Sequence, residues 1–217
     1  MDVVQLGTVE YRDAWELQQR LAGEVAQGTR PDTVLFLEHP PTVTLGRRSE
    51  PGELHLPDGV EVEVVEVDRG GKSTYHGPGQ LVCYPILDLT RHGRDVRRYC
   101  RVLEEALAET LAAFSLESTT FEGLTGVWFD RPPRKVASIG IHIHRWVTTH
   151  GYALNVDLDP APFTQWITAC GLDGYAFTSM AHELGRPVAL DEVRPVAARA
   201  LAAVLGVRFE DRAPATA

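Results

Sequence analysis

The chain has 217 residues, of which 44% are apolar and 24% are charged. This composition is typical of a soluble globular protein, and it excludes a disordered, collagen-like or coiled-coil chain. Lys and Arg together number 21 against 30 Asp and Glu, a formal net charge of −9 that argues against nucleic-acid binding. No apolar run reaches the roughly 20 residues needed to cross a bilayer. The length predicts a single domain over residues 1–217.

The cysteine pattern points to a reducing compartment. Cys83, Cys100 and Cys170 are an odd number at wide spacing, and the first 30 residues carry no signal-peptide pattern. Both features favour reduced thiols and a cytoplasmic location. Lysine is rare, because only Lys72 and Lys135 occur among the 21 basic residues.

The first third of the chain predicts one helix and several strands. Apolar residues at helical spacing predict a helix over Tyr11–Gln27, with Gly28 as its stop. Apolar runs and period-two alternation predict strands over Thr33–Glu38, Thr42–Leu45 and Val60–Val67.

Strands and helices are mixed in the remainder without strict alternation. Asp95 is the expected N-cap of a helix that runs to about Phe114. Pro162 opens a short helix, a final helix covers about residues 190–205, and residues 210–217 are expected to form a disordered tail. The order predicts an α+β fold with a mixed, mostly antiparallel sheet flanked by helices. Its further expected strands are Gln80–Leu87, Gly126–Phe129, Lys135–Trp146 and His150–Asp157.

The stretch Arg69–Gln80 is the most unusual in the sequence. It holds four glycines, a proline, a histidine and two basic residues between two apolar strands. Its glycines allow close approach to a ligand, and backbone N–H groups in such a loop can cradle an anion or a carbonyl oxygen. A glycine-rich connection without a ligand is the alternative. It is not a phosphate loop, because Glu66 stands where the earlier glycine is required.

Cys170 and Lys135 are the candidate reactive residues. Cys170 precedes Gly171 in a turn, where a thiol has room for a tetrahedral adduct. A small buried apolar residue is the other interpretation, and it suits Cys83 and Cys100. Lys135 stands at the mouth of an apolar strand, either snorkelling to water or held in a site, where a lysine beside a thiol stabilises the thiolate.

Several histidines are weaker candidates. His76, His150 and Gln80 are weaker candidates, and either histidine suits proton transfer or a hydrogen-bonded structural role. His142 and His144 share one face of a strand, but no third ligand follows at suitable spacing, so no metal site is expected.

The segment Arg69–Gln80, followed by Leu81–Ile86, resembles the signature of lipoyl(octanoyl) transferases. Further matches follow in order around Lys135–Gly140, Trp146–Asn155 and Ile167–Gly171. The resemblance covers about residues 1–185. One departure is Ala169, where the family usually has proline before the cysteine.

The resemblance implies a biotin/lipoate-protein-ligase-like fold and octanoyl transfer from acyl carrier protein to a lysine of a lipoyl domain. Such domains occur in 2-oxoacid dehydrogenase complexes and in the glycine-cleavage H protein. It implies that Cys170 forms the acyl-thioester and that Lys135 lowers its pKa and relays protons. Gln80, His150 and Asn155 are expected to support the site, and no cofactor or metal is expected. The acyl pocket would be lined by Arg69, Gly70, Gly71, Lys72, Ser73, Thr74, Tyr75, His76, Ser138, Ile139, Gly140, Gly151, Tyr152 and Ala153.

Two alternative functions remain open. One is an ATP-dependent lipoate or biotin ligase of the same fold, and the other is a non-catalytic module that binds acyl groups or lipoyl domains. Docking of an acidic carrier protein on this acidic chain requires a local basic patch. Such a patch, or only a solvated helix face, is formed by Arg91, Arg94, Arg97, Arg98 and Arg101.

Overall fold

The computed structural model describes residues 1–168 and 175–212. Its main sheet is mixed and mostly antiparallel, which confirms the expected α+β class. Within the described part of this main sheet, parallel pairing is confined to β1 with its two neighbours and to β11 with β9. The strands run in the spatial order β12 (Glu210–Arg212), β1 (Asp2–Thr8), β2 (Thr33–Glu38), β6 (Gln80–Ile86), β10 (Val147–Asn155), β9 (Arg134–His144), β8 (Leu124–Phe129) and β7 (Thr119–Phe121), and β11 (Ala176–Phe177) pairs with β9.

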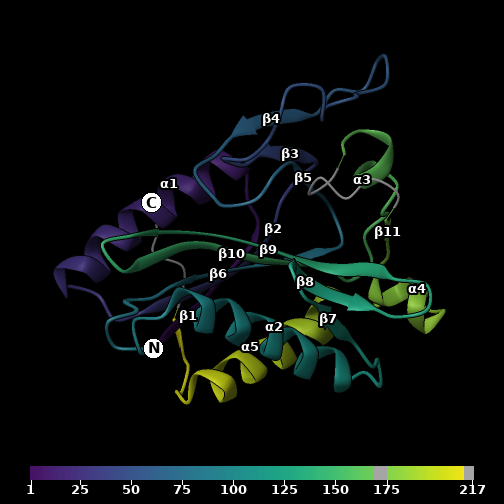
Figure 1. Cartoon of the computed structure of the whole chain (residues 1–217). Coiled ribbons are helices and arrows are strands. Elements are labelled where there is room, and N and C mark those ends of the chain that lie inside the picture. Colours follow the sequence, from purple (N-terminus) through teal and green to yellow (C-terminus); the bar gives the residue numbers. More distant parts are fainter. Residues whose placement is uncertain (169–174, 213–217) are drawn as a thin grey trace.

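Helices cover both faces of this sheet (Figure 1). The helix α1 (Tyr11–Gln27) packs its apolar stripe on one face and ends at Gly28, whose φ of 72° suits a glycine. The helices α2 (Val96–Ala112) and α5 (Leu190–Leu205) lie together on the other face, over the larger apolar core. The expected cap of α2 is confirmed, because the Asp95 side chain accepts a hydrogen bond from the Arg98 backbone N–H.

A small second sheet lies on the α1 side of the main sheet (Figure 1). Its strands are β4 (Glu63–Glu66), β3 (Thr42–Leu45) and β5 (Thr74–His76), and the short helices α3 (Pro162–Gln165) and α4 (Met180–Leu184) follow later in the chain. The expected strand over Val60–Val67 is too long. Only Glu63–Glu66 form a strand in register with β3.

The β9–β10 hairpin corrects a second boundary. The expected strands ended at Trp146 and restarted at His150, whereas β10 starts at Val147. Arg145 and Trp146 have φ of 50° and 70°, so they form a two-residue turn with both residues in the left-handed region. The short turn extends the hairpin, and it places Ser138 opposite Ala153 and Gly140 opposite Gly151.

Two further expectations concern the C-terminal part. The final helix is confirmed as Leu190–Leu205. The expected tail over 210–217 is wrong for Glu210–Arg212, which pair with β1, while 213–217 lie outside the described residues. The expectations for Ala169, Cys170 and Gly171 also fall outside the described residues. Within the described ranges, no helix has the length and apolar character required to cross a membrane.

Candidate functional site

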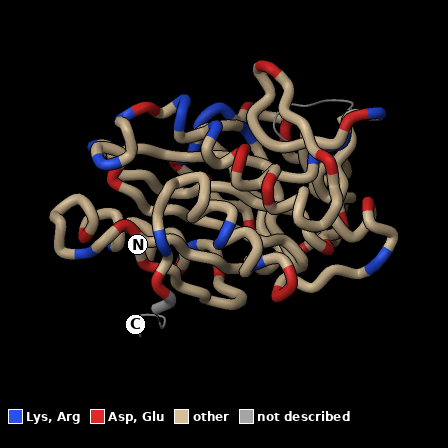
Figure 2. Tube along the Cα trace, turned by 90° about the horizontal axis from the view of Figure 1, so that it is seen from below, with Lys and Arg blue, Asp and Glu red and all other residues tan. Residues whose placement is uncertain are grey.

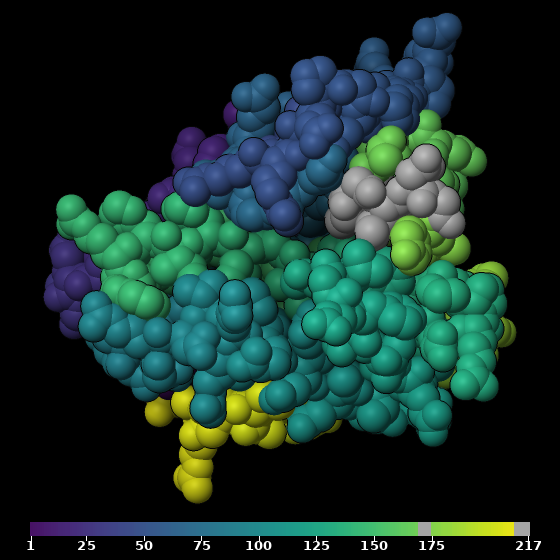
Figure 3. All heavy atoms as spheres, viewed as in Figure 1, coloured from purple at the N-terminus to yellow at the C-terminus, as the bar shows by residue number. Residues whose placement is uncertain are grey.

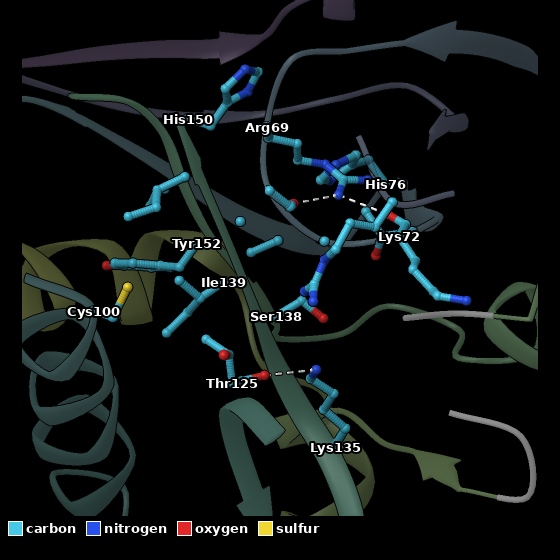
Figure 4. A pocket seen from close by; sticks show the side chains of 18 of the residues that line it. Arg69, Lys72, His76, Cys100, Thr125, Lys135, Ser138, Ile139, His150 and Tyr152 are labelled. Atoms are coloured by element: carbon cyan, nitrogen blue, oxygen red, sulfur yellow. Dashed lines mark hydrogen bonds between the residues drawn. The ribbon is translucent and has the colours of Figure 1, made fainter. Parts of the chain in front are cut away.

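A cavity of about 250 Å³ follows the β9–β10 hairpin (Figure 4). In the space-filling view it appears as a hollow between the residues near 50–70, β9 and β8 (Figure 3). Most of the expected site residues line it, but Ser73, Tyr75, Gln80 and Asn155 do not. The expected residues in its wall are Arg69, Gly70, Gly71, Lys72, Thr74, His76, Lys135, Ser138, Ile139, Gly140, His150, Gly151, Tyr152 and Ala153.

Two glycines allow neighbouring backbone to approach the β9–β10 wall of the cavity closely. A Cβ on Gly140 would stand 3.0 Å from Arg69 Cδ and 3.2 Å from the Gly70 carbonyl oxygen. On the neighbouring strand, a Cβ on Gly151 would collide with the Cys83 carbonyl oxygen. The loop after Asp68 therefore rests directly on the sheet, and the Gly70 N–H donates to the Ile141 carbonyl oxygen over 2.8 Å.

Lys135 stands at the β8 end of the cavity. Its side chain is buried, and its Nζ donates to the Thr125 carbonyl oxygen over 2.9 Å. The Nζ also lies 5.1 Å from the centre of the Trp128 ring, a cation–π distance. The structure therefore holds this amine inside the protein, where the sequence left snorkelling open.

Both flanks of residues 169–174 are fixed beside the cavity. On one side, Ser73 Oγ donates to the Thr168 carbonyl oxygen over 3.1 Å, and the Thr168 N–H donates to the Glu53 carbonyl oxygen over 2.8 Å. On the other, Phe177 pairs with Lys135, and the Thr178 N–H donates to the Lys135 carbonyl oxygen over 2.9 Å. Thr168, which precedes the segment that contains Cys170, therefore contacts the glycine-rich loop, and Phe177, which follows that segment in the sequence, pairs with Lys135.

Arg69 holds the glycine-rich loop from within. The side chain is buried, and its guanidinium donates to four oxygens of the loop and of β3: those of Gly70, Lys72 and Thr44, including Thr44 Oγ1 at 2.6 Å. These hydrogen bonds hold the Arg69 guanidinium against the loop and β3. The arginine shapes the loop, and together with Gly70, Gly71 and Lys72 it lines the cavity.

Lys72 is tied to two glutamates. Its Nζ lies 2.7 Å from Glu53 Oε1 and 3.0 Å from Glu50 Oε1. Hydrogen bonds to these carboxylates raise the pKa of Lys72 and keep it charged. Because the Glu53 backbone also contacts Thr168, the two ion pairs connect the glycine-rich loop to the residues that precede Cys170.

The end of the cavity away from Lys135 consists of two tyrosines and two histidines. Tyr11, His76, Tyr84 and His150 line it, and His39 supports them from behind. We call these five residues the His/Tyr end. It is uncharged at neutral pH, because burial lowers the pKa of His39 to about 4 and that of His76 well below 6.5, while burial raises the pKa of Tyr11 to about 12.

The polar atoms of the His/Tyr end are bonded to the protein. His39 Nδ1 donates to the Val9 carbonyl oxygen over 2.7 Å, so in the neutral ring Nε2 accepts from the Tyr84 hydroxyl over 2.8 Å. His150 is bonded to Asp68 Oδ1 at 2.8 Å and to the Tyr11 hydroxyl at 3.3 Å. These contacts occupy both ring nitrogens of His39 and of His150.

His150 also has an unusual backbone. Its φ is 57°, a left-handed value that is uncommon for a residue with a side chain. Its N–H donates to Gln18 Oε1 over 2.7 Å, so a buried side chain of α1 satisfies the displaced group. Strain of this kind is concentrated at functional sites.

Gln80 and Asn155 support the cavity from outside its wall. Gln80 Oε1 is bonded to His76 Nδ1 at 2.7 Å, and Gln80 Nε2 donates to Asn155 Oδ1 over 3.0 Å. Asn155 Nδ2 donates in turn to the Thr178 carbonyl oxygen over 3.0 Å. This row of amides joins the His/Tyr end to the residues beside Lys135.

Sequence reasoning missed several residues of the cavity. Tyr11 and Tyr84 are read as core residues in their own elements, and His39 carried no signal. Cys100 was assigned to the apolar core, but it lines the cavity with Thr125 and Leu124. No local pattern marks them, because they come together only when α1, β6, α2 and β8 pack around the hairpin.

Known proteins with the same sequence features identify the family. The lipoyl protein ligase A/B catalytic domain matches residues 10–202. An octanoyltransferase of Mycobacterium tuberculosis is 49% identical over 221 aligned residues, covering 100% of this chain and 93% of the relative. One of Geobacter sulfurreducens is 46% identical over 198 residues, covering 91% of this chain and 82% of the relative.

The chain belongs to the octanoyltransferase family. Solved structures of this family's wider fold agree with its architecture. A bipartite lipoate protein ligase of Thermoplasma acidophilum superposes with a TM-score of 0.75 at 17% identity, over 99% of this chain and 87% of that one. Biotin protein ligase from Aquifex aeolicus superposes with a TM-score of 0.54 at 13% identity, over 94% of this chain and 69% of that one. The expected ligase-like fold is therefore confirmed.

Proposed function

We propose that this chain moves octanoyl from octanoyl-acyl carrier protein to a lipoyl-domain lysine through a thioester on Cys170. Family membership supports octanoyl transfer as the reaction. The observation that carries the proposal is the cavity itself. Burial keeps the histidines at the His/Tyr end uncharged by lowering their pKa values, and at the other end Lys135 pairs with Phe177, which follows the Cys170 segment in the sequence.

The cavity suits a medium-length acyl chain. Its wall along β9 and β10 is built from Ser138, Gly140, Gly151 and Ala153, whose small side chains leave a groove. Burying an alkyl chain there gains about 0.8 kcal/mol for each methylene removed from water. The acyl methyl end would rest against the rings of the His/Tyr end, and the thioester carbon would lie near Lys135.

Sequence distance supports a meeting of Cys170 and Lys135. Cys170 follows Thr168 by two residues, which span at most about 7 Å of extended chain. Thr168 itself contacts Ser73 of the glycine-rich loop. The proposal therefore requires Cys170 to reach Lys135 from Thr168, a residue that the glycine-rich loop holds.

The first half-reaction forms the acyl-enzyme. Lys135, as an amine, accepts the Cys170 thiol proton, and the thiolate attacks the thioester carbon of the donor. The carbon–sulfur bond to the pantetheine thiol breaks, and that sulfur takes the proton back from Lys135. Exchange of one thioester for another is nearly balanced in energy, so no nucleotide is required.

The second half-reaction releases the product. The amine of the acceptor lysine attacks the Cys170 thioester and loses a proton to Lys135, while the Cys170 sulfur leaves and is reprotonated. Conversion of a thioester into an amide is downhill. We propose lipoyl domains of 2-oxoacid dehydrogenase complexes and the glycine-cleavage H protein as acceptors, and the cytoplasm as the compartment.

The intermediate is directly testable by mass. Wild-type protein mixed with octanoyl-acyl carrier protein, without ATP or Mg²⁺, should gain the mass of one octanoyl group, and Cys170→Ser should gain none. Cys83→Ser and Cys100→Ser are the matched controls and should still acylate. If acylation required ATP, or if a control blocked it while Cys170→Ser did not, the assignment would be wrong.

A further inference from the structure

The first turns of α2 carry a concentrated positive charge on an acidic protein. Arg94, Arg97, Arg98 and Arg101 are all exposed, and so is the apolar side chain of Val96, at 41% of its full area. We call these five residues the α2 basic patch. In Figure 2 many of the blue segments lie toward the upper left, with a few red segments among them.

Helix stability does not explain these arginines. The positive end of the helix dipole lies at the N-terminus, where cations are unfavourable, and the first turn of α2 holds no acidic residue. Arg97 and Arg101 are also one turn apart, so they repel each other. Among the described residues, no carboxylate forms an ion pair with Arg97, Arg98 or Arg101, although Asp95 caps the helix nearby.

The α2 basic patch lies next to the Lys135 end of the cavity. Cys100, within the same helical turns, lines the cavity. One turn further, Glu104 Oε1 accepts a hydrogen bond from the Gly126 N–H over 3.1 Å, and a Cβ on Gly126 would stand 2.8 Å from Lys135 Cε. Arg97 precedes Cys100 by three residues, a rise of about 4.5 Å along the helix.

We propose that the α2 basic patch is the docking surface for the acyl donor protein. This inference rests on the proposed function. The partner it fits is an acidic protein with an apolar contact residue, which presents its acyl group on a flexible phosphopantetheine arm. Such an arm bridges the one or two helical turns between the patch and Lys135, whereas a lysine fixed on a folded acceptor domain has to dock directly over Lys135.

Charge reversal within the α2 basic patch tests donor binding separately from acceptor binding. The triple variant R97E/R98E/R101E should raise the KM for octanoyl-acyl carrier protein about tenfold at low salt and leave the KM for a lipoyl domain unchanged. The difference should shrink at high salt, because exposed charges are screened over about 10 Å at 0.1 M ionic strength. Glutamate at a helix N-terminus is favourable, so the variant should fold at least as stably as the wild type.

A control triple, R20E/R199E/R208E, makes the same change of net charge at exposed arginines outside the cavity wall. It should keep the wild-type KM for the donor. Val96→Ser should raise the donor KM a few-fold at both low and high salt, since an apolar contact is not screened.

A small donor distinguishes failure of the docking proposal from failure of the proposed function. The patch variant should use octanoyl-pantetheine, which carries no protein, as well as the wild type does. A rise in the lipoyl-domain KM alone, or an equal effect of the control triple, would overturn the docking proposal. If the wild type transferred octanoyl from neither donor, the proposed function itself would fail.

Discussion

At one end of the cavity Lys135 offers an amino group held by a backbone carbonyl and an indole ring, whereas at the other end two tyrosines and three histidines bond to the protein and to one another. Both ends are buried and both contain polar side chains. They differ in what those side chains can still do. A lysine amine can exchange a proton with a reacting group, whereas His39 and His150, whose ring nitrogens are all bonded, form a neutral surface.

This contrast teaches how an apolar ligand can be bound by polar residues. Burial keeps His39 and His76 uncharged by lowering their pKa values, and it raises the pKa of Tyr11 to about 12. Hydrogen bonds within the protein then occupy both ring nitrogens of His39 and of His150. Rigidity is a second consequence, because a fully bonded network resists rearrangement.

The largest effect should come from removing proton exchange at Lys135. Lys135→Arg keeps the positive charge, but guanidinium does not give up its proton, so kcat for octanoyl transfer should fall about 100-fold or more. Turnover in a coupled assay with a lipoyl domain measures it. Lys72→Arg is the comparison, because an arginine preserves the ion pairs to Glu50 and Glu53, and its loss should be a few-fold at most. Similar losses in both variants would leave Lys135 an electrostatic role only.

The His/Tyr end should dominate the acid sensitivity of folding. The folded pKa of His39 is about 4 against 6.5 in its unperturbed state, so the unfolded chain binds a proton first as pH falls. Stability due to this group is complete above pH 6.5 and is lost as pH falls toward 4, by roughly 3 kcal/mol in all. Urea unfolding at pH 7 and pH 4.5 measures this loss.

His39→Gln serves as the reference for that measurement. The variant should be less stable at pH 7, since the Tyr84 hydroxyl loses a partner, but its stability should change less between the two pH values. Parallel curves for the two proteins would show that other groups, such as Asp68, set the acid sensitivity. Asp68 itself has a lowered pKa, mainly through its hydrogen bond to His150.

A smaller effect is expected from the cavity wall between the two ends. Gly140→Val places atoms against Arg69 and Gly70, so the loop must shift and kcat/KM for the donor should fall about tenfold, or roughly 1.4 kcal/mol. Gly23→Ala in α1 is the matched control. Nothing lies within 4 Å of its new Cβ, and the helix should gain about 0.5–1 kcal/mol. Unchanged kcat/KM in Gly140→Val would mean that the acyl chain does not run along this wall.

Much of the local structure could be predicted from the sequence. The spacing of Tyr11, Ala14, Leu21 and Val25 fixes the buried face of α1, and the Asp95 cap locates the start of α2. Errors occurred where a partner strand sets the length, as at Val60–Val67, or where a turn is decided by backbone pairing, as at Trp146. The ends of these strands depend on residues that are far away along the chain.

The site divides in the same way. The sequence by itself determined which reactive groups exist: one unusual loop, Lys135 as one of two lysines, and Cys170 beside a glycine. Only the tertiary structure decided that Arg69 serves the loop, that Lys135 is buried beside Thr125, and that Tyr11, Tyr84 and Cys100 form cavity walls. The reason is physical. The chemical type of a side chain is a property of the residue itself, whereas its burial, its pKa and its hydrogen-bond partners depend on what the fold packs against it.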